Sequence, residues 1–478
     1  MIVCSLLLCF SACKHNDPVD PPQPQDTTVV PVDTTTTPVD TIVVPVDTTT
    51  TPVDTTVSPK DTAYISRSLQ SQINRALPMT GLVLWVYNAR ERNEQYGKSI
   101  SMEFSYCLPC KVVKGKSNGE IQYDWSSFDE MLDEIASRDH QAIVRFRYEY
   151  PSSTDVDGKK GTTAVPDYIK ALPDYNETYS KNPGGDGPTY YADWSNSELQ
   201  WFTKQFYTDF CARYSHDKRL AFLEVGFGHW SEYHIYGTKL QLGVNFPTKE
   251  YQAEFFRHMT QVSDGLPWCV SIDAADDEYS PVAGNNELLG LKFGVFDDSF
   301  MHKDHEIGSA DGWNEQMWNM INGKSRWQQS PCGGEISYYE ERDQHDFLNP
   351  QGLYGVTWEQ AASKYHISFM ISNDAPEGQY GTAKRFLEAA AASGYRFEIT
   401  ALESNDINTR LTIINKGVAP IYRPAFVSMN GIRSDYNLMQ LMPEQQQTLE
   451  FPLTKNDSLD VEIESDFTLI NIPYDASL

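Results

Sequence analysis

Two glutamates in the sequence have the surroundings needed for acid–base chemistry. Glu232 lies in Gly-His-Trp-Ser-Glu-Tyr-His at 228–234, and Glu335 lies in Cys-Gly-Gly-Glu-Ile at 332–336. Each follows a short apolar run that is typical of a buried strand. Cleavage of a glycosidic bond requires one protonated carboxyl that donates to the leaving oxygen and one carboxylate that attacks carbon or activates water. These two residues are therefore the candidate catalytic pair.

The stretch 220–234 changes from an apolar strand to a loop that carries aromatic and polar side chains. Gly226 and Gly228 interrupt the strand, and we expect them to loosen the loop. Trp230 lies two residues before Glu232, and burial against its ring would raise the pKa of the carboxyl, as a general acid requires.

Other acidic and basic residues offer competing interpretations. Glu224 lies inside the apolar part of the same stretch, so we expect it to form a buried pair with an arginine rather than to do chemistry. Arg145 and Arg147 alternate along a neighbouring apolar run and are the candidate partners. The same arginines could also form purely structural ion pairs with Glu232 and Glu335.

The elements that must position these residues follow a β/α rhythm from residue 77 onward, which predicts a parallel sheet. We expect strands at 82–87, 102–108 and 142–148, at the start of 220–234, at 268–272 and 291–296, in a short run reaching 335, and at 366–371. We expect helices at 125–136, 197–214, 249–262, 313–321, 358–365 and 382–393, and a long loop at about 151–196. Eight such units predict a (β/α)8 TIM barrel, whose active site lies at the C-terminal strand ends.

The C-terminal region has a different pattern. From residue 395 the apolar residues recur with a period of two, and Asn-Lys-Gly at 415–417 and Asn-Asp at 456–457 are turn signals. This pattern predicts a small antiparallel β-sandwich after the barrel. The expected organisation is a signal segment at 1–13, a stalk at 14–63, the barrel at 64–395 and the sandwich at 396–478.

The N-terminal segment resembles a bacterial lipoprotein signal, because a short apolar run leads into Phe-Ser-Ala-Cys at 10–13. That resemblance implies that Cys13 becomes the lipidated first residue, so that a lipid chain alone anchors the protein to the membrane. An ordinary cleaved signal peptide is the alternative. The expected location is the outer membrane or cell surface.

The stalk repeats every seven residues from Pro24, in units such as Pro-Val-Asp-Thr-Thr-Thr-Thr. A proline in every unit excludes a continuous helix and predicts an extended spacer. Each unit contains Asp-Thr followed by Thr, Ile or Ala, which resembles an O-glycosylation sequon of Gram-negative bacteria. An unmodified spacer is the alternative. The candidate glycosylated residues are Thr27, Thr34, Thr41, Thr48, Thr55 and Thr62.

The composition bears on the class of ligand. The formal net charge is -28 and aromatic residues make up 12% of the chain. So acidic a chain argues against nucleic-acid binding, since phosphates need cationic partners. Aromatic faces and carboxylates suit neutral glycans, which stack on rings and offer hydroxyls.

The segments around Glu232 and Glu335 resemble glycoside hydrolases of the large clan that carries an acid/base glutamate after the fourth strand and a nucleophile glutamate after the seventh. The chain is more similar still to a group of uncharacterised glycosidase-like bacterial lipoproteins that have a Gly-x-Trp-Gly-Glu-Trp-His-type segment and a C-terminal sandwich. Ser231 and Tyr233 stand where that segment has glycine and tryptophan, and the Asn-Glu dipeptide of the clan is absent at Glu232. The resemblance covers roughly 80–475. The candidate substrate-binding residues are Trp230, His234, Arg147, Asp297 and Trp85.

No cofactor and no metal are predicted. Asp297 and Asp298 precede a run of His and acidic residues at 302–306, but the spacing matches no recognised metal site. The acidic run at 273–278 is interpreted as a solvated loop. Cys107 and Cys110 are expected to form a local disulfide or a pair of packed thiols.

The sequence thus predicts a surface-anchored glycoside hydrolase acting on an oligo- or polysaccharide. The alternative is a non-catalytic glycan-binding lipoprotein on the same scaffold, motivated by the departures around Glu232. Geometry separates the two, because carboxyls more than about 10 Å apart could not act as a pair. A structural component of a surface complex is a third hypothesis.

Overall fold

The computed structural model of the 478-residue chain describes residues 60–151, 163–235, 237–302, 312–372 and 378–478. The chain divides into two units after Ser58, and the described residues belong to the second, Pro59–Leu478. Cys13 and the candidate glycosylated threonines from Thr27 to Thr55 lie outside the described residues, whereas Thr62 lies within them and is exposed. Among the described helices, none has the length and hydropathy needed to cross a membrane.

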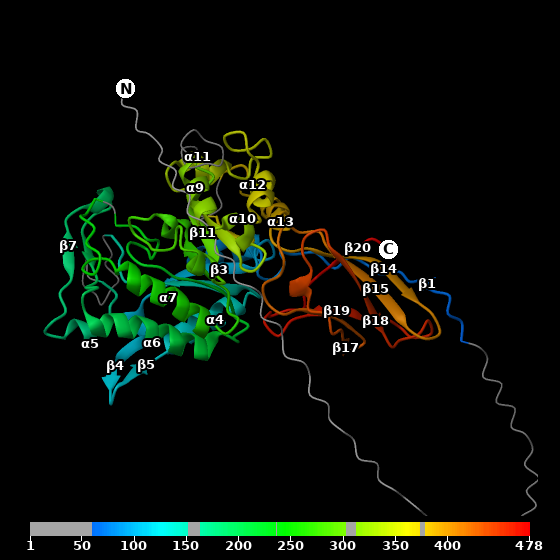
Figure 1. Ribbon diagram of the computed structural model, residues 1–478. Coiled ribbons are helices and arrows are strands. Elements are labelled where there is room, and N and C mark those ends of the chain that lie inside the picture. Colours follow the sequence, from blue (N-terminus) through cyan, green and yellow to red (C-terminus); the bar gives the residue numbers. More distant parts are fainter. Residues whose placement is uncertain (1–59, 152–162, 236, 303–311, 373–377) are drawn as a thin grey trace, which may run out of the picture. The chain divides into compact units, whose positions relative to one another are not determined.

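The centre of the second unit is a closed barrel of parallel strands (Figure 1). In chain order its strands are β2 (Gly81–Trp85), β3 (Met102–Cys107), β6 (Gln141–Phe146), β9 (Leu220–Glu224), β10 (Trp268–Ser271), β11 (Gly294–Phe300), β12 (Cys332–Ile336) and β13 (Phe369–Ile371). Each strand pairs with the next, and β13 closes the barrel on β2 through Phe369 opposite Gly81. The predicted (β/α)8 fold class is confirmed.

The barrel strands are stabilised by apolar side chains that are buried on both faces of the sheet. In β2, Leu82 and Leu84 belong to the outer core, whereas Val83 belongs to the inner one with Phe104 and Phe222 of other strands. All of these side chains are fully buried. Burial on both faces explains why the strands read as nearly continuous apolar runs in the sequence.

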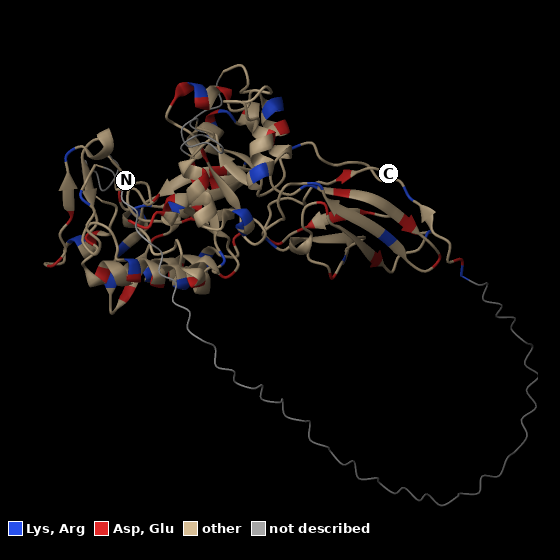
Figure 2. Ribbon diagram, turned by 45° about the horizontal axis from the view of Figure 1, so that its top comes forward, with Lys and Arg blue, Asp and Glu red and all other residues tan. Residues whose placement is uncertain are grey.

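Helices surround the barrel, and side-chain caps mark where several of them begin. The helices are α1 (Val86–Glu91), α2 (Asn93–Tyr96), α3 (Pro109–Val112), α4 (Ser126–Ala136), α5 (Asp167–Lys170), α6 (Ser197–Tyr214), α7 (Lys249–Val262), α8 (Asn286–Leu289), α9 (Trp313–Met320), α10 (Gly323–Arg326), α11 (Glu341–Asp346), α12 (Trp358–Tyr365) and α13 (Ala383–Ala391), with 3-10 turns η1 (Pro183–Gly185), η2 (Ile272–Ala275) and η3 (Leu438–Gln440). Asn196 and Thr248 accept hydrogen bonds from the first turns of α6 and α7. Figure 2 shows acidic and basic residues interspersed along these helices.

Two hairpins interrupt the β/α alternation. The first pairs β4 (Val113–Ser117) with β5 (Glu120–Tyr123), and the second pairs β7 (Thr178–Ser180) with β8 (Thr189–Tyr191). The second hairpin lies with α5 and η1 in the segment expected to be a long loop at 151–196. The described part of that segment therefore contains short elements that the Tyr-, Gly- and Pro-rich composition did not predict.

The C-terminal region consists of mainly antiparallel sheets, with one short parallel pairing near the C-terminus (orange to red in Figure 1). One sheet has the order β1 (Ile65–Ser66), β14 (Phe397–Ser404), β15 (Thr409–Asn415) and β18 (Gln446–Phe451), with β20 (Asp475–Ala476) also on β14, and the other has β17 (Ile432–Arg433), β16 (Phe426–Met429) and β19 (Val461–Glu464). Alternate residues such as Leu411 and Ile413 are buried, which is the period-two pattern of the sequence. Strand β1 precedes the barrel in sequence but pairs with this C-terminal sheet.

Candidate active site

A buried arginine gathers three glutamates at the C-terminal ends of the barrel strands. Arg145, near the end of β6, donates from Nε to Glu224 Oε2 at 2.8 Å and from Nη2 to Glu335 Oε1 at 2.8 Å. Its Nη1 bonds to Glu232 Oε1. Both predicted catalytic carboxyls therefore contact one planar guanidinium, so they are much closer than the roughly 10 Å that would exclude a catalytic pair.

The expected buried pair between Glu224 and a barrel arginine is present in this group. Glu224 and Arg145 are both inaccessible to solvent, and Arg145 Nη2 also lies 2.6 Å from Glu224 Oε2. Glu232 and Glu335 remain slightly exposed, at 6% and 4%. Of the three glutamates that contact Arg145, only these two therefore retain any contact with solvent.

Burial and the neighbouring charges raise the pKa values of Glu232 and Glu335. Burial raises the pKa of Glu232 well above its usual range, and the charge of Glu335 adds to this effect while Arg145 opposes it. Burial also raises the pKa of Glu335, to about 7, against the attraction of Arg145. One guanidinium cannot neutralise three carboxylates, so a proton is held in the group at neutral pH, and Glu232 is its favoured site.

Tyr106 is a member of the group that the sequence analysis missed. Its hydroxyl donates to Glu232 Oε1 at 3.3 Å and accepts from Arg145 Nη1 at 3.2 Å. The ring of Phe296 also lies under the Arg145 guanidinium, with the Cζ atom 4.3 Å from the ring centre. The only signal in the sequence was the position of Tyr106 near the end of the strand predicted at 102–108.

The loop that carries Glu232 is tightly constrained, contrary to the expectation that its glycines loosen it. Trp230, Ser231 and Tyr233 all adopt left-handed backbone conformations, with φ of 56°, 61° and 66°. A Cβ atom at Gly226 would overlap the carbonyl oxygen of Ser231, so the glycine is needed for close packing.

Backbone hydrogen bonds hold this loop in place. His229 N donates to His234 O at 2.8 Å, and Tyr233 N donates to Phe227 O at 2.7 Å. Ser231 Oγ donates to Phe146 O at 2.9 Å, which ties the loop to β6. Strained residues persist only where the surroundings fix them, and they are concentrated at functional sites. The Glu232 carboxyl is therefore presented from a preorganised backbone.

His234 links Glu232 to a second acidic group. Its Nδ1 lies 3.8 Å from Glu232 Oε2, and its Nε2 pairs with Asp273 and lies 3.2 Å from Asp298 Oδ2. Burial alone would lower the pKa of His234, but the charges of Asp273 and Asp298 outweigh it and raise the pKa to about 9. The imidazole is therefore positively charged at neutral pH.

The interpretation of residues 273–278 as a solvated loop is wrong for Asp273, which is 5% exposed and lies in η2. A run of acidic residues is usually solvated, and no local pattern indicates that His234 pairs with Asp273. Glu232, His234 and Asp298 each offer a ligand atom within 4.8 Å of the others, which are donor types suited to a divalent cation. In the structure the imidazole pairs with the two aspartates instead.

Asp297 and Asp298 were expected to follow the sixth strand, but they lie within β11, which continues to Phe300. The strand continues because Asp297 stays in register with Gly334 of β12. Asp297 accepts from Asn314 Nδ2 at 2.6 Å and is 4% exposed, and burial raises its pKa to about 8. It is therefore positioned by an amide rather than by a cation.

The candidate substrate-binding aromatics lie beside the glutamates. The half-buried Trp85, at the end of β2, has its ring centre 5.4 Å from that of Tyr106. Trp230 makes edge contacts with Tyr150 at 6.1 Å and with His234 at 5.9 Å. Trp85 thus contacts the tyrosine that bonds to Glu232, and Trp230 contacts the histidine that faces the same carboxyl.

Three other tryptophans, Trp194, Trp313 and Trp358, differ in burial. Trp194 and Trp358 are in fact fully buried, at 1% and 0% exposed, so they belong to the core. Trp313, at the start of α9, is half-buried.

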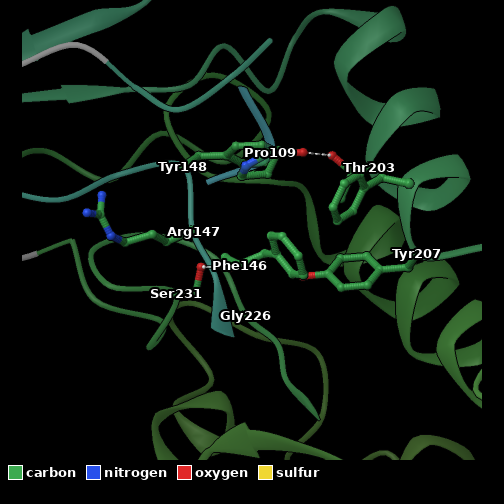
Figure 3. A pocket seen from close by; sticks show the side chains of 9 residues that line it. Pro109, Phe146, Arg147, Tyr148, Thr203, Tyr207, Gly226 and Ser231 are labelled. Atoms are coloured by element: carbon green, nitrogen blue, oxygen red, sulfur yellow. Dashed lines mark hydrogen bonds between the residues drawn. The ribbon is translucent and has the colours of Figure 1, made fainter. Parts of the chain in front are cut away.

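Arg147 lies next to a small cavity below the Glu232 loop (Figure 3). The cavity measures about 10 Å³, which is room for about one water molecule and far too small for a sugar. Arg147 stacks over the Tyr150 ring at 4.3 Å, and in Figure 3 its side chain points away from Thr203 and Tyr207. Arg147 therefore lies beside the aromatic residues Tyr106 and Tyr150.

Cys107, Cys110 and the histidine-containing run at 302–306 are the remaining residues that the sequence suggested for chemistry. Cys107 and Cys110 form no disulfide, so that alternative is wrong. His302 bonds through Nδ1 to Asp343 Oδ2 at 2.8 Å. The acidic and histidine residues at 304–306 lie outside the described residues.

The chain was compared with protein families, curated proteins and solved structures. No protein-family model and no curated protein matches the chain. Among solved structures, the chain is similar to the catalytic domain of a beta-amylase from Paenibacillus polymyxa, with 11% identity, a TM-score of 0.42 and coverage of 65% of this chain and 97% of that one. It is also similar to a GH39 enzyme from Xanthomonas axonopodis pv. citri (11% identity, TM-score 0.37, 85% and 95% coverage) and to a monomeric beta-xylosidase from Caulobacter crescentus CB15 (11%, 0.37, 85% and 96%). The strand pairing itself, rather than these likenesses, establishes the barrel.

Proposed function

We propose that the protein is a glycoside hydrolase in which Glu232 is the general acid and Glu335 the nucleophile or base. The observation that supports this proposal is the contact of both carboxyls with the single guanidinium of Arg145. Too few cations face these carboxyls for all to be ionised, so the two differ in protonation although they are the same residue type. We further propose that a lipid on Cys13 anchors the enzyme to the outer membrane or cell surface.

The proposed reaction begins with proton transfer from Glu232 to the glycosidic oxygen as the bond from that oxygen to the anomeric carbon breaks. Glu335, held by Arg145 Nη2, either attacks the anomeric carbon to form a glycosyl ester or takes a proton from the attacking water. In the first case water then releases the sugar, with Glu232 acting as base. A carboxyl separation of about 5 to 5.5 Å corresponds to the first route and retention of configuration.

A glycan-binding protein without catalysis is the second candidate. It is favoured by the engagement of Glu224, Glu232 and Glu335 in ion pairs with the buried Arg145, an arrangement that could serve structure alone. The experiments below separate the two, because binding alone requires no proton donor.

The pH dependence of kcat/KM should reflect both glutamates of the free enzyme. Activity needs Glu335 ionised, so kcat/KM should rise with pH through about 7, the pKa of that carboxyl, and level off above it. Activity also needs Glu232 protonated, so kcat/KM should fall again at alkaline pH, above its raised pKa. Rates across about pH 4 to 10 test this. An optimum near pH 5 would contradict the assignment, because it would correspond to carboxyls with ordinary pKa values.

Replacing Glu232 by glutamine should affect substrates according to their leaving group. A poor leaving group such as a sugar hydroxyl needs a proton, so we expect turnover to fall by about 10²- to 10⁴-fold. A 2,4-dinitrophenyl glycoside departs without a proton, so bond cleavage in a burst assay should change much less. Equal losses on both substrates would rule out the acid role. If the variant still loses activity near pH 9 on the dinitrophenyl glycoside, we expect the loss to reflect deprotonation of His234, whose pKa is raised to about 9.

A further inference from the structure

Two adjacent tyrosines follow the proposed nucleophile and are unusually open to solvent. Tyr338 and Tyr339 come three and four residues after Glu335, and they are 42% and 63% exposed. Exposed rings beside buried carboxyls are suited to bind the apolar face of a polar ligand. Neither residue was predicted from the sequence to belong to the site.

Tyr338 is hydrogen-bonded to Trp85, one of the aromatic residues of the site. Its hydroxyl accepts a hydrogen bond from Trp85 Nε1 at 3.1 Å. Trp85 in turn packs on Phe104 and Tyr106, with ring centres 4.7 and 5.4 Å apart, and Tyr106 donates to Glu232. A continuous set of contacts therefore connects this exposed tyrosine to the proposed acid.

Tyr339 rests on a buried polar group. Its ring centre lies 4.6 Å from that of His302. His302 bonds to Asp343, which is fully buried and also accepts from Tyr354 Oη at 2.5 Å. A satisfied buried network is rigid. An exposed ring on a rigid support loses little conformational entropy when a ligand stacks on it.

Tyr339 also lies near the acidic group of the site. Although most of the residue is exposed, desolvation and then the charges of Asp298, Asp273 and Asp297 raise the pKa of its hydroxyl to about 12. Around the site, six carboxyl groups face the three cationic groups of Arg145, Arg147 and His234. Burial raises the pKa of Glu232 and Asp297 so that both hold a proton at neutral pH, which leaves the carboxylates Glu224, Asp273, Asp298 and Glu335 in excess of the cations. An anionic sugar placed here would be repelled.

We propose that Tyr338 and Tyr339 form a platform for a second, uncharged sugar unit, adjacent to the unit cleaved at Glu335. The substrate would then be a neutral oligo- or polysaccharide rather than the glycoside of a single sugar. This inference rests on the proposed function, because it takes the glutamate pair as the point of cleavage.

The test measures binding in the Glu335→Gln protein, so that no turnover is needed. Calorimetry with xylohexaose, cellohexaose and mannohexaose should identify at least one ligand. Adding Tyr339→Ala should weaken the binding of that ligand about tenfold, as expected for a central aromatic contact. The matched control Tyr339→Phe keeps the ring and should stay within about twofold. Hexagalacturonate, an anionic hexasaccharide, should bind at least about tenfold more weakly than the neutral ligand.

Three outcomes would overturn the platform: no binding of any of the neutral hexasaccharides, equal affinities of the Ala and Phe variants, or preferred binding of hexagalacturonate. The two proposals can fail separately. Tyr339-dependent binding of a glycan that the wild-type protein leaves intact would reject hydrolysis and keep the platform. Hydrolysis of a glycan whose binding is insensitive to Tyr339→Ala would do the reverse.

Discussion

Replacement of Glu335 by glutamine is expected to lower turnover by about 10⁴-fold or more on every glycoside, whatever its leaving group. The reason is that glutamine keeps the size and the hydrogen-bonding oxygen that faces Arg145 Nη2 but cannot attack carbon or accept the proton of water. Initial rates on a panel of nitrophenyl and dinitrophenyl glycosides measure the effect. Thermal unfolding of the variant serves as the control for an intact fold.

This uniform loss distinguishes Glu335 from Glu232, whose removal should be tolerated by substrates with good leaving groups. A Glu335→Gln protein that retains a substantial rate on dinitrophenyl glycosides would remove this residue from the chemistry. Glu224 would then be the remaining carboxylate on Arg145, although it is inaccessible to solvent.

Replacement of Arg145 by methionine is expected to cost about 3 to 5 kcal/mol of unfolding free energy, because it leaves buried carboxylates without their cation. Glu224, Glu232 and Glu335 all pair with this one side chain. The deficit should shrink as the pH is lowered, since protonated carboxyls no longer need the guanidinium. Urea titrations followed by tryptophan fluorescence measure the change.

Arg257→Met is the matched control, because Arg257 forms a two-pronged ion pair with Glu287 on the surface. Removing an exposed pair should change the urea midpoint far less than removing the buried one. Equal losses of unfolding free energy in the two variants would show that Arg145 does not stabilise the three buried glutamates that it contacts.

Much of the barrel could be predicted from sequence because its signals are local. The helices at 197–214, 249–262 and 358–365 were predicted with the bounds of α6, α7 and α12. Their apolar spacing and the caps at Asn196, Thr248 and Thr357 are contained within a few turns of chain.

The partners within the site were harder to predict, because they come from strands far apart in the sequence. Glu232 and Glu335 could be selected by their positions after predicted strands, but the pairing of Asp273 with His234 could not, because an acidic loop gives no sign of its partner. Tyr106 and Tyr339 were missed for the same reason, since ring contacts depend on the folded barrel. Strand β1 likewise pairs with residues more than three hundred positions away.

The most direct test of the account asks whether a glycan that the site binds is also cut. A neutral hexasaccharide identified by binding to the Glu335→Gln protein should be incubated with the wild-type protein, and new reducing ends should be counted by mass spectrometry. The account predicts that reducing ends accumulate with the wild-type protein and are absent with the Glu232→Gln/Glu335→Gln double variant. A ligand that binds but stays intact with the wild-type protein at about pH 7, near the pKa of Glu335, would contradict hydrolysis and favour a glycan-binding protein.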